Sequence, residues 1–166
     1  MFKRLLPRIG SAVLSIGMLT SLASDSLALD SKFYHGTLCV QRSQIGSSKM
    51  SYGPGGFKND ATVADDFVCP IVRDASSSTV SDWGVRVDRN GSTAAWSVRL
   101  KSCDYDGDVC KISTANVPAT PTSGLILVDG GSVDSQIANG PMYIISSVPA
   151  GALIHSYRVT ESGGTD

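Results

Sequence analysis

Apolar and polar residues alternate with a period of two in several short segments of the chain, and this pattern predicts β-strands. The clearest run extends from Ser81 to Cys110, where Asn90-Gly91 and Asp106-Gly107 separate three alternating segments. Such pairs indicate tight hairpin turns, because a type I′ turn needs positive φ at both central residues. The pattern therefore predicts a three-stranded antiparallel meander over residues 81–113.

The first turn of this meander also fixes a register for its two strands. Every pair on one face is then apolar: Val87 with Ala94, Val85 with Trp96, and Trp83 with Val98. On the other face Asp82 lies opposite Arg99, where opposite charges attract. We therefore expect Trp83 and Trp96 in the core, since large aromatic side chains bury the most area.

Four cysteines follow the N-terminal region, and an even number in an exported chain indicates two disulfides. If Asp106-Gly107 closes the second turn, Cys103 lies directly opposite Cys110. Opposed strand residues have Cα atoms roughly 4.5–5.5 Å apart, which a disulfide can bridge. This pairing leaves Cys39 with Cys69. A metal or reactive-thiol role is disfavoured, because no C-x-x-C spacing occurs.

Further strands are expected on both sides of the meander, at residues 37–41, 61–71, 125–128, 142–148 and 153–161. The last two are predicted to pair through Pro149-Ala150-Gly151. Helices are disfavoured, because Glu161 is the only glutamate among 15 acidic residues while 17 residues are glycine. The expected fold is a single antiparallel β-sandwich, either jelly-roll or immunoglobulin-like.

The N-terminus has the three parts of a secretory signal peptide: basic Lys3, Arg4 and Arg8, an apolar run over residues 9–22, and small residues around Ala23. The run is shorter than the ~20 residues that a membrane-spanning helix needs. We expect cleavage after Ala23, or alternatively after Ala28, and a secreted or periplasmic chain. Residues 24–166 then form one domain with a flexible tail at 162–166, and no membrane span remains.

Removal of the signal peptide leaves 11 of the 14 basic residues against 15 acidic ones. The remaining lysines and arginines are dispersed along the sequence, whereas a phosphate-binding surface would cluster them. Nucleic acid is therefore not an expected partner.

The segment Asp104-Tyr105-Asp106-Gly107-Asp108 is the strongest candidate for a binding site, because it lies at a hairpin tip. Its carboxylates at 104, 106 and 108 suggest calcium. The segment does not match an EF-hand loop, which has its glycine at position six and a glutamate at position twelve, because the glycine here is at position four. No other cofactor is indicated. Tyr105, and Tyr52 in a glycine-rich loop, are the aromatic residues most available to stack on a ligand such as a glycan.

Catalysis has little support in the sequence. No G-x-S-x-G or H-E-x-x-H motif is present, and the chain has only two histidines, of which His155 is the better candidate base. Alternation places His155 on the apolar face of its strand with Leu153, Tyr157 and Val159. Asp65 and Asp66 could suggest a glycosidase pair, but adjacent strand residues point to opposite faces.

Three short segments, Cys39-Val40-Gln41, Asp66-Phe67-Val68-Cys69-Pro70 and Tyr157-Arg158-Val159-Thr160-Glu161, resemble uncharacterised exported bacterial β-sandwich proteins. The resemblance implies export and a β-sandwich, and it carries over no catalytic residue. The leading hypothesis is a non-catalytic module that binds a glycan or a surface protein. The alternatives are a secreted hydrolase of extracellular polymers and a calcium-dependent adhesion-type module.

Overall fold

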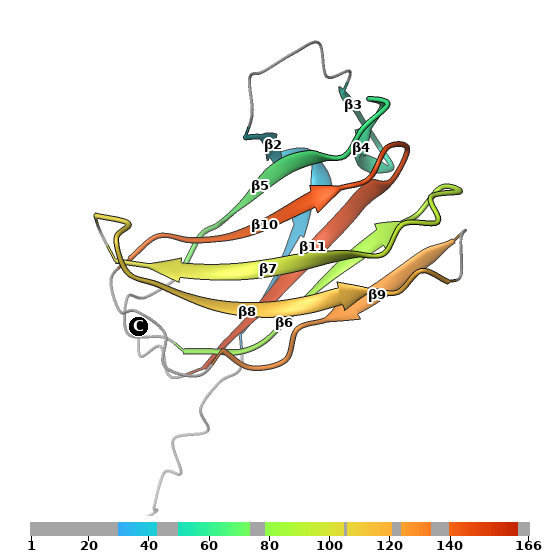
Figure 1. Cartoon of the computed structure of the whole chain (residues 1–166). Helices are drawn as coiled ribbons and strands as arrows, with labels where there is room; N and C mark the ends of the chain where they lie inside the picture. Colours follow the sequence, from blue (N-terminus) through green and yellow to red (C-terminus); the bar gives the residue numbers. More distant parts are fainter. Residues whose placement is uncertain are drawn as a thin grey trace, which may run out of the picture.

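The computed structural model describes residues 30–42, 50–73, 79–104, 106–120, 124–133 and 140–162. Its strands form two antiparallel sheets that pack face to face, as Figure 1 shows, so the predicted β-sandwich is confirmed. The predicted signal peptide, Tyr105 and the tail from Gly163 lie outside the described residues. No helix among the described residues is long and apolar enough to cross a membrane.

Sheet A is built around the last strand of the chain. It contains six strands: β1 (Asp30–His35), β3 (Met50–Gly53), β4 (Gly56–Asn59), β6 (Thr79–Asp88), β9 (Leu125–Asp129) and β11 (Leu153–Ser162). β11 pairs with β6 along one side, and with β1 and β4 along the other. This central position explains why β11 is mostly buried.

Sheet B packs against sheet A and has the strand order β2-β5-β10-β7-β8. Its strands are β2 (Val40–Gln41), β5 (Asp65–Ile71), β7 (Trp96–Cys103), β8 (Cys110–Val117) and β10 (Met142–Val148). A short 3-10 turn, η1 (Gly36–Leu38), lies between β1 of sheet A and β2 of sheet B. The bounds of β10 are those that the sequence pattern predicts.

The predicted meander over residues 81–113 is half correct. β7 and β8 form the expected hairpin, with Cys103 opposite Cys110 and Trp96 opposite Val117. β6, however, belongs to the other sheet, so the predicted pairing of β6 with β7 is wrong. Asn90 and Gly91 do adopt positive φ angles of 42° and 87°, and Ser92 N donates to Arg89 O across the turn. The turn then leads into irregular chain that crosses to sheet B.

The predicted pairing of the last two strands fails for the same reason, because β10 lies in sheet B and β11 in sheet A. Apolar alternation nevertheless identifies the buried faces of β6 and β7 correctly. Trp83, Val85 and Val98 are fully buried, and Trp96 is almost so. Two strands whose apolar faces meet across the core have the same sequence pattern as two strands paired in one sheet. The salt bridge expected between Asp82 and Arg99 is replaced by one from Asp82 to Arg158.

A bulge at His155 changes the predicted faces of β11. Ile154 lies opposite Val87 and Ser156 opposite Arg86, so His155 is an extra residue in the ladder. Such an insertion shifts the alternation of side chains by one position. Ile154 is therefore fully buried, whereas Leu153 and His155 are only half-buried. Beyond the bulge Tyr157 and Val159 point into the core, as predicted.

Both expected disulfides form. Cys103–Cys110 joins the paired ends of β7 and β8, and Cys39–Cys69 joins the start of β2 to β5 across 30 residues of sequence. A cross-link over a loop of this length stabilises a domain by roughly 3 kcal/mol, mainly by restricting the unfolded chain. All cysteines are paired.

Candidate functional site

Three of the connections between the two sheets lie near one another: β4–β5, β6–β7 and β10–β11. In Figure 1 the β6–β7 and β10–β11 connections lie on the right-hand side, and the tip of the β7–β8 hairpin lies at the opposite end. Residues from all three connections line a cavity of about 660 Å³ that is broadly open to solvent, which we call the loop-end cavity. This volume lies within the range of roughly 300–1,000 Å³ that is typical of small-molecule sites.

Among the described residues that line the loop-end cavity, none has a charged or titratable side chain. Five of them carry hydroxyl groups: Thr62, Ser92, Thr93, Ser97 and Ser147. The others are small or apolar, apart from a single aromatic residue, Trp96. A general acid or base must lie within hydrogen-bond reach of the reacting atom. The lining therefore offers hydrogen bonds and apolar contact, but no group for acid–base catalysis.

The first connection is fixed by Asn59, the last residue of β4, which is fully buried. Its Nδ2 donates to Val63 O at 3.0 Å and to Val148 O at 2.8 Å, while its Oδ1 accepts from Ala61 N at 2.9 Å. Its backbone groups also bond to the β10–β11 turn, at Gly151 N and Ala152 O. Asn59 therefore holds the first and third walls of the cavity together.

The second connection wraps around the side chain of Arg89, which is fully buried. Its Nε donates to Ser92 O at 2.9 Å and its Nη2 to Ala94 O at 2.8 Å. The guanidinium lies 5.4 Å from the ring centroid of Trp96, in a cation–π contact. Arg89 thus shapes the loop and supports the indole that lines the cavity.

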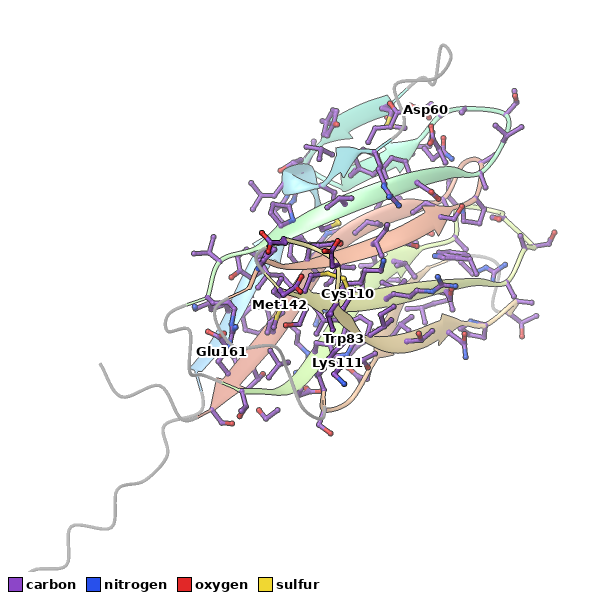
Figure 2. All side chains as sticks on the ribbon, turned by 60° about the vertical axis from the view of Figure 1, so that its left-hand side comes forward. Asp60, Trp83, Cys110, Lys111, Met142 and Glu161 are labelled. Carbon is purple, nitrogen blue, oxygen red and sulfur yellow. A yellow bond between two sulfur atoms is a disulfide. The ribbon has the colours of Figure 1, made fainter. Side chains whose placement is uncertain are left out.

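The second and third connections are also joined to each other. Asn90 Nδ2 donates to Gly151 O at 3.1 Å, and Asp88 Oδ1 accepts from Asn90 N at 2.8 Å. On the first connection Lys58 Nζ lies 2.6 Å from Asp60 Oδ1, and hydrogen bonds from Lys58 and Ser51 hold the pKa of Asp60 below its usual value. Figure 2 shows Asp60 at this end of the sandwich and Glu161 at the other. The cavity walls are therefore tied together before any ligand binds.

The two tryptophans differ in how their indole N–H groups are used. Trp83 Nε1 donates to Ser113 Oγ at 3.1 Å, as expected of a core residue. Trp96 Nε1 is buried and has no hydrogen-bond partner among the described residues, and the same is true of Arg89 Nη1. A buried donor without a partner costs roughly 1–3 kcal/mol. The two donors belong to side chains in contact with each other, and of these two residues Trp96 lines the loop-end cavity.

Tyr52, which the sequence suggested for ligand binding, does not line this cavity. Tyr52 lies on β3, with half of its surface exposed and its ring edge-on to Phe57. Tyr105 is outside the described residues. Tyr52 is therefore not among the residues that line the cavity with Trp96, and the suggested role of Tyr105 stays a prediction.

The predicted calcium ligands Asp104, Asp106 and Asp108 are not gathered into a cluster. Among the described residues, no group of three His, Cys, Asp or Glu side chains could hold a metal ion. Asp104 instead closes the hairpin tip, where its Oδ1 accepts from Val109 N at 3.2 Å and its carbonyl accepts from Gly107 N at 3.1 Å. The acidic sequence is accounted for by the turn that it forms.

The candidate base His155 also lies outside the loop-end cavity. Its Nδ1 is 3.4 Å from Ser156 Oγ, and its ring centroid is 5.9 Å from that of His35. Asp65 and Asp66 diverge as alternation predicts: Asp65 Oδ2 accepts from Gln41 Nε2 at 2.6 Å, whereas Asp66 faces the outer side of sheet B. These residues do not converge on a common substrate position.

Sequence reasoning missed the loop-end cavity itself. It placed Trp96 in the core, which is correct for its burial, but it did not reveal that the same ring borders a cavity. The sequence contains no recognisable motif around Asn59, Arg89 or Asn90. A signal was nevertheless present, because each lies at the end of an apolar strand and immediately before a segment of small and hydroxyl-bearing residues.

No family model matches the chain, and no curated protein matches it either. Among solved structures, the chain is similar to a β-(1,4)-mannanase of Podospora anserina, GH26-CBM35, with 16% identity and a TM-score of 0.49 over 82% of this chain and 28% of the mannanase. It is also similar to CsCBM6-3 of Clostridium stercorarium, solved with cellobiose, with 12% identity and a TM-score of 0.42 over 72% of this chain and 89% of that one. The chain thus spans less than a third of the mannanase, and neither similarity assigns it to a family.

Proposed function

We propose that this chain is an exported, non-catalytic binding module that holds a neutral saccharide in the loop-end cavity. The observation that carries the proposal is the lining: the described residues present hydroxyl groups and one indole to the cavity, and none of them is charged. A neutral saccharide offers hydroxyl groups that both donate and accept, and its C–H faces pack on aromatic rings. A charged ligand would lose its hydration there without gaining a counter-charge.

The fixed connections around the cavity support the same proposal. Asn59, Arg89 and Asn90 hold the three loops through side-chain bonds to backbone carbonyls. A site ordered in advance loses less conformational entropy when it binds, which raises the affinity of a small polar ligand. The indole N–H of Trp96, which has no partner among the described residues, is the donor that we assign to a ligand hydroxyl.

Export is part of the proposal and is supported by the two disulfides, which persist in oxidising compartments. A hydrolase is less well supported, because the lining of the cavity contains no carboxylate and no histidine. The function proposed is therefore recognition of a saccharide without its cleavage.

The test is calorimetric titration of the purified chain with neutral hexasaccharides: cellohexaose, mannohexaose, xylohexaose and maltohexaose. Ala95 is exposed and lines the cavity, so Ala95→Trp should fill it without disturbing the core. The matched control is Val109→Trp, an exposed position at the tip of the β7–β8 hairpin.

We expect at least one hexasaccharide to bind, Ala95→Trp to weaken it at least tenfold, and Val109→Trp to leave it unchanged. Equal affinity of the wild-type chain and Ala95→Trp would refute the cavity as the site. No heat with any of the four neutral hexasaccharides would refute binding of this ligand class.

A further inference from the structure

The outer face of sheet B carries a second hollow, of about 180 Å³, on the side of this sheet that faces away from the core. Three basic residues line it, Arg42, Arg99 and Lys101, together with one acidic residue, Asp66. We call it the cationic hollow. Arg42 and Asp66 lie far from Arg99 and Lys101 in the sequence, which is why the sequence predicted dispersed charges.

Strand geometry explains how the basic residues come together. Arg42 N donates to Asp66 O at 2.8 Å, which holds the end of β2 beside β5. On β7, Arg99 and Lys101 are two residues apart and therefore share a face. Ile145 of β10, which also lines the hollow, lies directly opposite Arg99. The hollow thus extends across β2, β5, β10 and β7.

The charges in this hollow are not neutralised by the protein. No carboxylate among the described residues lies within ion-pair distance of Arg42, Arg99 or Lys101. Sheet A is different, because Arg158 there lies 2.8 Å from Asp82 and 3.0 Å from Asp129. The chain has 15 acidic residues, so the surplus of positive charge in the hollow is local.

The neighbouring side chains restrict the kind of anion that suits the hollow. Ser97 and Ser147 line it as well, and Ser147 lies directly opposite Asp66. A carboxylate in this position repels a ligand that carries only anionic groups, but it accepts hydrogen bonds from hydroxyl groups. A ligand with both acidic groups and hydroxyls satisfies the basic residues and Asp66 together.

We propose that the cationic hollow binds an acidic saccharide, one that carries carboxylate or sulfate groups. Arg99 and Lys101 pair with the anionic group, because guanidinium and ammonium groups form charge-assisted hydrogen bonds to its oxygens. Asp66 and the two serines accept and donate bonds to the sugar hydroxyls. Ser97 and Ser147 also line the loop-end cavity, so the two hollows adjoin, but the basic residues and Asp66 line only the cationic hollow. The proposal does not rest on saccharide binding in the cavity.

The test compares four probes by calorimetric titration: polygalacturonate for carboxylate, dextran sulfate for sulfate, neutral dextran, and inorganic polyphosphate as an anion without sugar hydroxyls. The test variant is the double substitution Arg99→Gln/Lys101→Gln. The matched control is Arg86→Gln/Lys111→Gln, which removes the same charge from two exposed residues that do not line the hollow.

We expect one of the two acidic polysaccharides to bind, and neutral dextran not to. The test variant should weaken this binding at least tenfold, and the control variant less than threefold. Equal losses in the two variants would show that only net charge matters and would overturn the proposal. The absence of binding to both acidic polysaccharides would do the same.

Asp66→Asn separates an acidic saccharide from a simple polyanion. Loss of the carboxylate should weaken binding of the acidic saccharide, because hydroxyl groups lose a charged acceptor, and should strengthen binding of polyphosphate, because repulsion is removed. Stronger binding of both probes would contradict the saccharide assignment. Ala95→Trp should leave acidic binding unchanged, so failure at one site is distinguishable from failure at the other.

Discussion

The loop-end cavity and the cationic hollow lie on one sandwich, but they are built in different ways. The cavity is formed by three connections between the sheets, and buried Asn59 and Arg89 fix their backbones. The hollow is formed by side chains that alternate outward from regular strands, and Arg42 and Arg99 there are exposed. The cavity therefore selects by shape and hydrogen bonds, whereas the hollow selects by charge.

The largest expected effect of a single substitution concerns the connections of the cavity. Asn59→Ala removes three hydrogen bonds of a fully buried side chain and leaves Val148 O without this donor. We expect the free energy of unfolding to fall by about 2–4 kcal/mol, measured by urea denaturation.

Asn116→Ala, at an exposed position on β8, is the control for Asn59→Ala and should change stability by less than about 0.5 kcal/mol. If Asn59→Ala lowered the free energy of unfolding as little as Asn116→Ala, the connections would not depend on Asn59. The loop-end cavity would then be no more firmly held by buried hydrogen bonds than the cationic hollow.

The second-largest expected effect is on saccharide affinity, and it concerns the indole of Trp96. Trp96→Phe keeps an aromatic ring beneath Arg89 but removes the N–H that has no partner among the described residues. We expect the affinity for a neutral hexasaccharide to fall about tenfold, which corresponds to about 1.4 kcal/mol.

Trp83→Phe removes an indole N–H that already bonds to Ser113, and it serves as the control for Trp96→Phe. This control should lower stability and leave saccharide affinity as it is. Equal affinity of Trp96→Phe and the wild type would show that the indole N–H does not meet the ligand.

The salt dependence of ligand binding should differ between the loop-end cavity and the cationic hollow. Neutral saccharide binding should change by less than about twofold between about 0.05 and 0.5 M NaCl, while acidic polysaccharide binding should weaken several-fold, because salt screens exposed charges. Calorimetric titration at both concentrations measures the two responses on the same preparation. Parallel salt dependence would mean that the two ligands share one site.

The smallest effect concerns Asp60, next to the first wall of the cavity. Hydrogen bonds from Lys58 and Ser51 lower the pKa of Asp60. The ionised carboxylate therefore stabilises the folded protein at pH values above its unfolded-state pKa of about 4. This contribution is lost as the pH falls through the lower pKa of the folded state. Asp60→Asn should therefore be slightly less stable than the wild type at pH 7, with the difference vanishing at pH 2. A constant difference in thermal midpoint across this range would contradict the assignment.

Much of the sandwich could be predicted from the sequence, because alternation and turn residues are local. They correctly indicated β10, the register of β7 with β8 and both disulfides. The strand partners of β6 and β11 could not be predicted in this way. Asn90-Gly91 fixes a reversal of the chain, but the reversal serves a crossing between sheets as well as a hairpin within one.

The two sites escaped prediction for the same reason, since each depends on how distant segments meet. The cavity requires three crossings to lie at one end of the sandwich, and the hollow requires Arg42 to lie beside β5 and near Arg99. The acidic tip around Asp106 was conspicuous in the sequence, yet it is explained by a turn. Local composition therefore drew attention to the hairpin tip and not to the loop-end cavity.

The most direct test of the central claim is a two-dimensional ¹⁵N NMR titration of the purified chain with whichever neutral hexasaccharide binds. We expect shift changes to concentrate in residues 61–64, 91–97 and 147–151 and in the indole N–H of Trp96, while the amides of Arg42, Arg99 and Lys101 stay in place. Changes centred on the outer face of sheet B, or on the β7–β8 hairpin tip, would contradict the assignment of neutral saccharide binding to the loop-end cavity.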